Sequence, residues 1–209
     1  SPTSVVATNV GTSRAYNNGS ASVAFSAGAI AGRSYTVTSS PGSYTATGSS
    51  SPITVTGLQS STQYTYTVTA TNNYGTSSAS SASSGVTATT VPQAPTIGTA
   101  TNTGVSGEIL VTFTAGATGG STITSYTVTS SPGNITASGS SSPITVTGLT
   151  NGTSYTFTVT ATNTDGTSSA SSASNSVSPS IIKASGGTIT SSGGYTYHTF
   201  TSGGTFTPN

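Results

Sequence analysis

Apolar residues alternate with Thr or Ser along most of the chain, as in the stretches YTVTSS (35–40) and YTYTVTA (64–70). A two-residue period puts every second side chain on the same face, so it predicts strands with one buried face. Turn-forming Gly, Pro and Asn separate these stretches. In the first half of the chain the pattern predicts strands near 3–9, 20–27, 33–39, 43–47, 52–57, 62–72 and 76–87. Their number and spacing, without any helical period, are typical of a two-sheet antiparallel β-sandwich.

The chain also contains an internal repeat. Residues 35–86 align with residues 126–177 at an offset of 91, and about 40 of the 52 positions are identical. Upstream the offset drops to 88, which leaves three extra residues of the second copy in the loop before Tyr126. Copies of one folded unit are expected to differ in length within loops. We therefore predict two tandem sandwiches, at 1–90 and 91–180.

The alternation also predicts which side chains form the two cores. About a dozen apolar side chains per copy, of which the large ones each contribute roughly 1.5–3 kcal/mol on burial, can offset the ordering entropy of a domain this size. In the first copy the predicted core is Val23, Phe25, Tyr35, Val37, Ile53, Val55, Leu58, Tyr64, Tyr66, Val68 and Ala70. In the second copy it is Ile109, Val111, Phe113, Tyr126, Val128, Ile144, Val146, Leu149, Tyr155, Phe157, Val159 and Ala161.

Both copies share a motif that resembles the fibronectin type III module. The motif has Tyr-x-Val on the third strand and, after Gly-Leu and five further residues, Tyr-x-aromatic-x-Val-x-Ala-x-Asn followed by Gly-x-Ser; in the second copy Ala94-Pro95 leads the first strand. The copies depart from the animal pattern in having Phe25 and Phe113 where Trp is usual. Their sequences are similar to bacterial and bacteriophage versions of the module. The resemblance implies an immunoglobulin-like sandwich and a tyrosine corner in each copy, formed by Leu58 with Tyr64 and by Leu149 with Tyr155.

The repeat stops after Ser180, and the last segment, 181–209, is punctuated by Gly pairs. Short alternating runs between these pairs predict a β-hairpin or meander that is too small to form a core alone. The segment is similar to glycine-rich ends of bacteriophage structural proteins and of some bacterial surface proteins. The similarity implies an assembly tail, with apolar contacts expected from Ile181, Ile182, Tyr195, Tyr197, Phe200 and Phe206.

Composition limits what the chain can bind. Ser and Thr supply about 90 of the 209 residues, whereas Lys and Arg number 3, Asp and Glu number 2, and Cys is absent. Without a basic cluster, binding to a nucleic-acid backbone is not expected. No apolar run reaches the ~20 residues that span a bilayer, so no membrane insertion is expected. The near absence of charge also means that something other than Lys must keep the sheet edges from pairing with other chains.

Catalytic and metal-binding chemistry is not expected. The single His, His198, lies in the tail, and the two acids, Glu108 and Asp165, lie in turns that a sandwich can place at different ends. A nucleophilic triad, a carboxylate pair and a metal ligand set each need such groups together. Asp165-Gly166 is better explained as turn chemistry. We therefore predict a non-enzymatic protein without a metal or other cofactor.

Positions where the copies differ are the best candidates for partner contacts, because the shared residues specify the fold. The first copy has a longer turn at 11–19 that contains Tyr16, and it has Tyr44 and Tyr74 where the second copy has Ile135 and Asp165. These tyrosines either cap the ends of the sandwich or contact a neighbouring subunit or a glycan, since exposed Tyr suits recognition.

These observations lead to two functional hypotheses. The first is a structural protein of a bacteriophage virion, a rod-like spacer, decoration or head or tail fibre component on the particle surface, attached through 181–209. Its partners are other structural proteins or further copies of itself as a homo-oligomer, and host-surface glycans. The second is a secreted or cell-surface bacterial adhesion or carbohydrate-binding module that uses Tyr16, Tyr44 and Tyr74, as part of a longer extracellular protein or filament.

Overall fold

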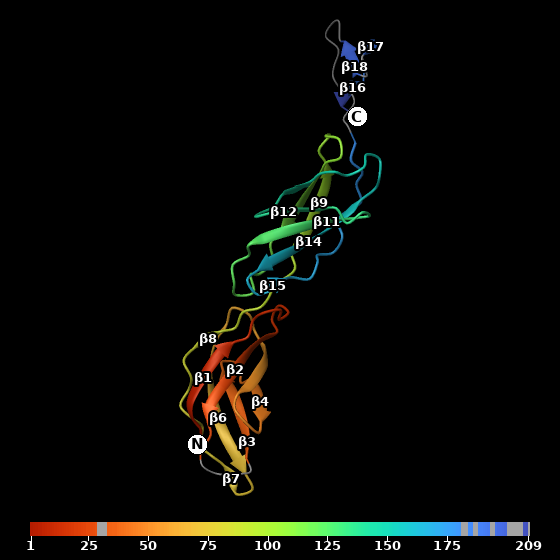
Figure 1. The fold of residues 1–209 in the computed structure, drawn as a ribbon. Helices are drawn as coiled ribbons and strands as arrows, with labels where there is room; N and C mark the ends of the chain where they lie inside the picture. The colour runs from red at the N-terminus through yellow and green to blue at the C-terminus, as the bar shows by residue number, and fades with distance from the viewer. Residues whose placement is uncertain (29–32, 181–183, 186–187, 193–194, 200–206, 209) are drawn as a thin grey trace.

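The computed structural model describes residues 1–28, 33–180, 184–185, 188–192, 195–199 and 207–208, and side chains up to residue 180. The described part contains strands and turns but no helix. Two β-sandwiches lie end to end, and the strands of the C-terminal segment follow the second one (Figure 1). We call the sandwiches module 1 and module 2.

Module 1 contains two antiparallel sheets. One sheet has the order β1-β2-β5, with β1 at Thr3–Asn9, β2 at Gly19–Ser26 and β5 at Ile53–Leu58. The other has the order β4-β3-β6-β7, with β4 at Thr45–Gly48, β3 at Ser34–Ser40, β6 at Gln63–Asn72 and β7 at Gly75–Thr76, and β8 (Val86–Thr87) also pairs with β6. The first six strands lie within two residues of their predicted positions.

Module 2 repeats this arrangement. Its sheets have the orders β13-β10-β9 and β12-β11-β14-β15. The strands are β9 (Thr96–Asn102), β10 (Ile109–Thr114), β11 (Ser125–Ser131), β12 (Thr136–Gly139), β13 (Ile144–Val146), β14 (Thr156–Asn163) and β15 (Gly166–Thr167). Register is conserved between the copies: Val37 lies opposite Val68 in module 1, and Val128 lies opposite Val159 in module 2.

The C-terminal segment forms two separate strand pairs. Strand β17 (Thr188–Ser192) pairs with β18 (Tyr195–Thr199) as an antiparallel hairpin, and β16 (Ala184–Ser185) pairs with β19 (Thr207–Pro208). The expected contact residues Ile181, Ile182, Phe200 and Phe206 lie outside the described residues. Tyr195 and Tyr197 lie on β18, where the structure describes the backbone alone.

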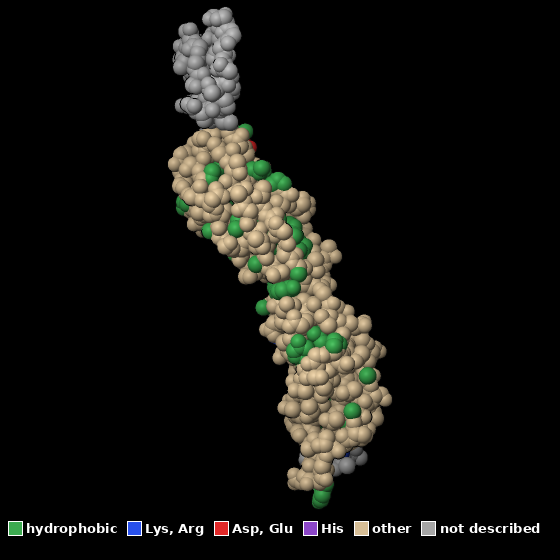
Figure 2. Space-filling view, turned by 180° about the vertical axis from the view of Figure 1, so that it is seen from behind, with side chains coloured by type: hydrophobic (Ala, Val, Ile, Leu, Met, Phe, Trp, Pro, Cys, Tyr) green, Lys and Arg blue, Asp and Glu red, His purple; other side chains and the backbone are tan. Residues whose placement is uncertain are grey.

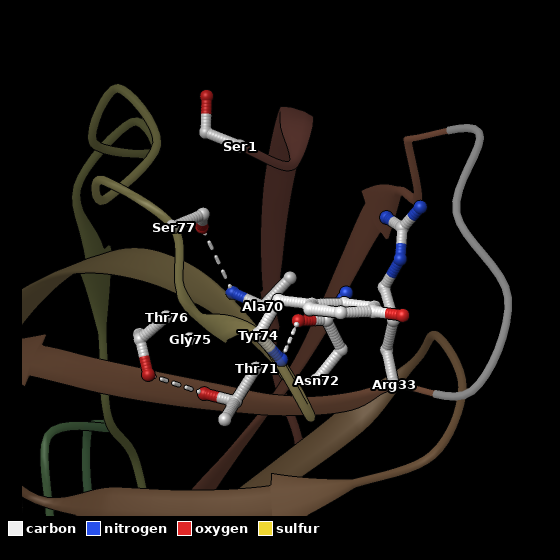
Figure 3. A pocket seen from close by; sticks show the side chains of 9 residues that line it. All are labelled: Ser1, Arg33, Ala70, Thr71, Asn72, Tyr74, Gly75, Thr76 and Ser77. Atoms are coloured by element: carbon white, nitrogen blue, oxygen red, sulfur yellow. Dashed lines mark hydrogen bonds between the residues drawn. The ribbon is translucent and has the colours of Figure 1, made fainter.

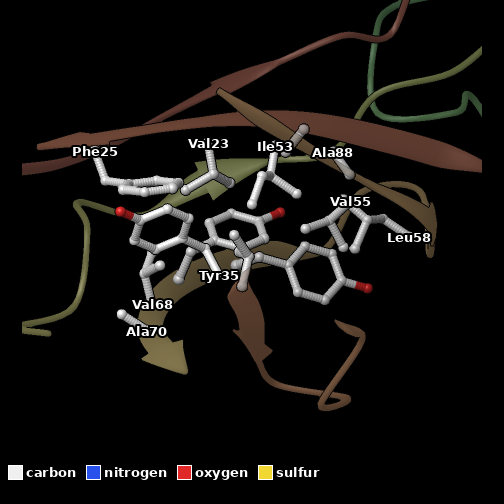
Figure 4. Packing of buried hydrophobic residues seen from close by; sticks show 13 residues of the cluster. Val23, Phe25, Tyr35, Ile53, Val55, Leu58, Val68, Ala70 and Ala88 are labelled. Carbon is white, nitrogen blue, oxygen red and sulfur yellow. The ribbon is translucent and has the colours of Figure 1, made fainter. Parts of the chain in front are cut away.

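All predicted core residues of both modules are buried. Apolar side chains of the two sheets fill the space between them in module 1 (Figure 4). The aromatic side chains pack alike in the two modules, since the ring centroids of Phe25 and Tyr35 and those of Phe113 and Tyr126 are both 4.8 Å apart. Phe thus fills the place of the usual Trp without loss of an enclosed core. The surface seen in Figure 2, by contrast, is mainly backbone and uncharged polar side chains.

Both tyrosine corners are confirmed. The Gln59 N–H donates to the Tyr64 hydroxyl at 3.0 Å, and the Thr150 N–H donates to the Tyr155 hydroxyl at 3.1 Å. The bond from Thr150 lowers the pKa of Tyr155, because a donated hydrogen bond favours the phenolate. The preceding glycines of the two corners, Gly57 and Gly148, both have φ 77°, a left-handed conformation that explains the Gly-Leu turn.

One buried hydroxyl distinguishes the two cores. Tyr66 of module 1 is 1% exposed, and its hydroxyl has no hydrogen-bond partner among the described residues. Burial raises the pKa of Tyr66 to about 12, and the neighbouring Tyr64 adds to the rise. Module 2 has Phe157 at the equivalent position, so its core carries no such polar atom.

The predicted strand at 76–87 is wrong. Only β7 and β8 at its two ends are strands. Between them, every third residue is hydrogen-bonded to β6. The N–H groups of the repeat donate to β6 carbonyls, and its hydroxyl oxygens accept from β6 N–H groups, at distances of 2.8–3.1 Å. The residues involved are Ser77, Ser80 and Ser83, which bond to both backbone groups of Ala70, Val68 and Tyr66.

Each of these serines also donates its hydroxyl hydrogen to the carbonyl of the next residue, so its side chain is held at both ends. We call residues 77–84 the serine segment. Module 2 has the same arrangement, with Ser168, Ser171 and Ser174 bonded to Ala161, Val159 and Phe157. Three residues of the segment therefore advance as far as two residues of the neighbouring strand.

Candidate functional site

The three candidate tyrosines lie at three separate places on module 1. Tyr44 packs against the core, with its ring centroid 5.9 Å from that of Tyr64 in an edge-to-face arrangement. Tyr16 is half-buried in the turn between β1 and β2, beside module 2. Tyr74 is 98% exposed in the turn between β6 and β7, at the far end of the module. The three side chains therefore do not form one surface.

The turn that carries Tyr74 is held by local hydrogen bonds (Figure 3). The Tyr74 N–H donates to the Asn72 side-chain oxygen at 2.9 Å, and the hydroxyls of Thr71 and Thr76 are 2.8 Å apart. These bonds fix the backbone on both sides of the turn while the phenol of Tyr74 projects into solvent. The turn therefore presents a large amphipathic side chain on an ordered support.

A shallow hollow of about 340 Å³ lies beside Tyr74. Its lining includes Arg33, one of only 3 cationic Lys or Arg residues of the chain. One guanidinium nitrogen of Arg33 is buried and has no hydrogen-bond partner among the described residues. The hollow also has the hydroxyls of Thr71, Thr76 and Ser77, so this end of module 1 combines an aromatic ring, a cation and hydroxyl groups.

The opposite end of module 1 meets module 2 at Asp165. The Asp165 carboxylate accepts hydrogen bonds from the hydroxyls of Ser121 at 2.7 Å and of Thr89 at 3.1 Å. Its backbone carbonyl accepts the Ser13 N–H of module 1 at 2.7 Å. The 2.9 Å bond from the Asp165 N–H to the Asn163 side chain supports the predicted turn, whereas the contact with module 1 was not predicted.

The linker between the modules is bonded on both sides. The Val91 N–H donates to the Arg14 carbonyl of module 1 at 3.0 Å, and the Thr90 N–H donates to the Gly119 carbonyl of module 2 at 2.8 Å. The buried side chain of Asn163 donates to the Thr90 carbonyl at 2.9 Å. Together with Asp165, these bonds hold the two modules in one relative orientation.

Among the described residues, the ionisable groups are not gathered into a site. The turn between β9 and β10, which contains Glu108, lies at the end of module 2 opposite the turn that contains Asp165 (Figure 1). In the described part of the chain, no group of three or more His, Cys, Asp or Glu residues could hold a metal ion. The side chain of His198 lies outside the described residues. No helix of the described residues is long and apolar enough to cross a membrane.

Comparison with protein families identifies the second module. Residues 93–177 match the model of the fibronectin type III domain. Module 2 is a fibronectin type III domain. Domains of this type are generally non-catalytic scaffolds or binding modules, and module 1 has the same strand order and the same tyrosine corner. A search of curated protein sequences gave no match.

Solved structures with similar folds include three multidomain proteins. The FN1–FN3 domains of chicken CNTN1 are 15% identical, with 90% of this chain and 71% of that chain covered and a TM-score of 0.42. Titin kinase with its flanking domains is 27% identical over 43% of this chain and 17% of that chain, with a TM-score of 0.38. The twitchin kinase region of C. elegans is 20% identical over 48% and 21%, with a TM-score of 0.39. This chain thus spans only about a fifth of the two kinase-containing chains.

Proposed function

We propose that the protein is a non-enzymatic structural component of a bacteriophage virion, in which the two modules act as a spacer on the particle surface. The proposal is supported chiefly by the bonded junction between the modules, because a spacer must hold its two ends apart. The Asp165 carboxylate, the Ser13 N–H and the linker all contribute to that junction. A decoration or fibre of this kind needs neither a catalytic centre nor a cofactor.

In this proposal the C-terminal segment attaches the spacer to other structural proteins of the particle or to further copies of the chain. The segment has no copy in either module, and its strands pair only briefly with one another in the described residues. Module 1 then lies furthest from the particle, with Tyr74 and Arg33 at its outer end. That end is suited to contact host-surface glycans.

Deletion of residues 181–209 tests this assignment. We expect the two modules to fold and melt as before, because every residue of the two cores, including the partly buried Val5, Ala7 and Val177, precedes residue 181. We also expect the chain to be lost from purified particles. The matched control is the full-length chain with Tyr74→Ala, which should incorporate normally. Normal incorporation of the truncated chain would contradict the attachment role.

A second function is supported by the outer end of module 1. An exposed Tyr74 beside a cationic, hydroxyl-lined hollow is also suited to an adhesion or carbohydrate-binding module of a bacterial cell-surface or secreted protein. The gene's neighbours discriminate between the two functions. Capsid and tail genes support the virion component, whereas a cell-wall anchor or a hydrolase domain on the same chain supports the surface module.

A further inference from the structure

A second hollow, of about 420 Å³, lies between the modules rather than at an end. It is formed by the turn between β1 and β2, by the linker and by the residues around β15. Sites for small ligands are commonly 300–1,000 Å³ in volume and lie preferentially at domain interfaces. The turn at 11–19 that forms one wall is also longer than the corresponding turn of module 2, which lies between Asn102 and Ile109.

The lining of this hollow is uncharged and rich in hydrogen-bonding groups. Tyr16 supplies one aromatic ring, and Ser13, Thr167, Ser169 and the amide of Gln93 supply polar groups between the apolar side chains of the linker. The Gln93 side-chain oxygen already accepts the Ala117 N–H at 3.2 Å, so its NH₂ group is left to donate outward. An aromatic face surrounded by hydroxyl and amide groups matches a ligand that has both C–H faces and hydroxyls.

The two charged residues next to the hollow are occupied elsewhere. The guanidinium of Arg14 bonds to the carbonyl and side chain of Asn18, at 2.9 and 3.3 Å. The Asp165 carboxylate is bonded to Ser121 and Thr89. Neither charge is therefore directed at a ligand, so the lining offers hydrogen bonds but no ionic partner. This electrostatic setting favours a neutral ligand over an acidic one.

The walls of the hollow are held before any ligand binds. The backbone bonds from Ser13 to Asp165 and from Val91 to Arg14 join the turn of module 1 to both other walls. The Asn17 N–H and the Ser60 hydroxyl, 2.9 Å apart, tie the far side of the same turn to the body of module 1. A preformed site avoids much of the ordering cost that otherwise weakens the binding of flexible groups.

We propose that this hollow is a binding site for a neutral saccharide, with the ring of Tyr16 packing against a sugar face and Gln93, Thr167 and Ser169 bonding to its hydroxyls. The site needs both modules, because Tyr16 comes from one and Thr167 and Ser169 from the other. It is separate from the outer end of module 1, which carries Arg33. The inference holds whether or not the protein is a virion component.

The test is a titration of the ¹⁵N-labelled full-length chain with neutral tetrasaccharides of glucose, mannose and N-acetylglucosamine, and with a tetrasaccharide of galacturonate. At least one neutral probe should shift the amide signals of Ala15, Thr167 and the Gln93 side chain at millimolar concentration. The galacturonate probe should bind more weakly. Absence of shifts at these positions with every neutral probe, or equal binding of galacturonate, would overturn the proposal.

Variants identify the side chain responsible. We expect Tyr16→Ala to weaken binding by about tenfold or more, because aromatic anchors at the centre of an interface carry much of the affinity. Tyr16→Phe keeps the ring and should retain most of the affinity. The control is Val105→Ala, which removes an exposed side chain from the turn between β9 and β10, away from the hollow, and should leave affinity unchanged. Melting curves show that the variants fold, and equal losses for Tyr16→Ala and Val105→Ala would contradict the site.

Discussion

The two modules have nearly the same core but different residues at their ends. About 40 of 52 aligned residues are identical, the buried strands have the same register, and the same serine positions bond to the same strand. At the turn after the long central strand, however, module 1 has a fully exposed Tyr74 where module 2 has Asp165 bonded to its neighbour. Repetition therefore specifies how each module folds, whereas divergence at the ends specifies what each module touches.

The largest expected difference between the modules follows from a cavity made in one core. Leu58→Ala removes a fully buried side chain from module 1 and should destabilise that module by about 2–5 kcal/mol. Calorimetry should show one transition at lower temperature and the transition of module 2 nearly in place, because the two cores share no residue. Leu149→Ala is the matched variant in module 2 and should reverse the pattern. Equal shifts of both transitions would show that the modules unfold as one unit.

A smaller effect is expected when the turn of module 2 at the junction is given the residue that module 1 has at the equivalent position. Asp165→Tyr places the residue of module 1 into module 2 and removes the acceptor of the Ser121 and Thr89 hydroxyls. Each lost charge-assisted bond is worth about 1.5–3 kcal/mol, less where water replaces the partner. Small-angle scattering should show a broader range of distances between the modules, with both modules folded.

The other acid of the chain supplies the control for that experiment. Glu108→Gln changes the same net charge at the opposite end of module 2 and should leave the scattering unaltered. If Asp165→Tyr and the wild type scatter alike, the carboxylate does not hold the junction and the backbone bonds of the linker are sufficient.

The serine segments are expected to contribute less than the junction. Ser80→Ala leaves the Val68 N–H without its acceptor inside the protein, and an unsatisfied buried group costs about 1–3 kcal/mol. Ser171→Ala should cost the same in module 2, where the Val159 N–H loses its acceptor. The neighbouring Ser81→Ala is the control, because exposed substitutions away from such contacts usually change stability by less than about 0.5 kcal/mol. Denaturant unfolding measures all three, and equal costs at Ser80 and Ser81 would contradict the bonding pattern.

The smallest effect is expected at the Tyr66 hydroxyl, the buried polar group that distinguishes the core of module 1 from that of module 2. Tyr66→Phe gives module 1 the residue of module 2 and removes a buried hydroxyl without a partner, so we expect stability to rise by about 1 kcal/mol. Melting of the two proteins side by side measures the change. A loss of stability instead would show that the hydroxyl is hydrogen-bonded in solution.

The same variant should change the pH dependence of unfolding. Because the pKa of Tyr66 is raised from 10.0 to about 12, folding favours the protonated phenol. The contribution of this pKa shift to the stability of module 1 is complete below pH 10.0 and is lost as the pH rises toward 12. Module 1 of the wild type should therefore lose more stability over this range than Tyr66→Phe does.

Sequence predicted the fold well because alternation decides which face of a strand is buried. Every residue in the predicted cores is buried, and the corners at Tyr64 and Tyr155 have the expected hydrogen bonds. The last strand was wrong because Ser and Ala at a period of three look like a polar strand when each residue is weighed alone. The signal was present in the spacing of Ser77, Ser80 and Ser83.

The contacts between modules could not be predicted in the same way. Whether Asp165 and Tyr16 meet a neighbour depends on how the two sandwiches are oriented, which no local pattern encodes. Two of the positions at which the copies differ, Asp165 and the turn at 11–19, lie at the junction. Tyr44 shows the limit of that approach, because it differs between the copies and yet packs on its own core.

The three-to-two pairing of the serine segment has a consequence for the behaviour of the protein at high concentration. An incoming β-strand from another molecule repeats every two residues and needs backbone donors and acceptors at that interval. The serine segment pairs at every third residue, so we expect the backbone N–H and C=O groups on its outer side to lie at a different interval. An incoming strand then loses register with them after one or two hydrogen bonds. Most soluble proteins repel such strands with charge. At this edge of the sheet a mismatch of pitch therefore hinders such pairing without any charged side chain.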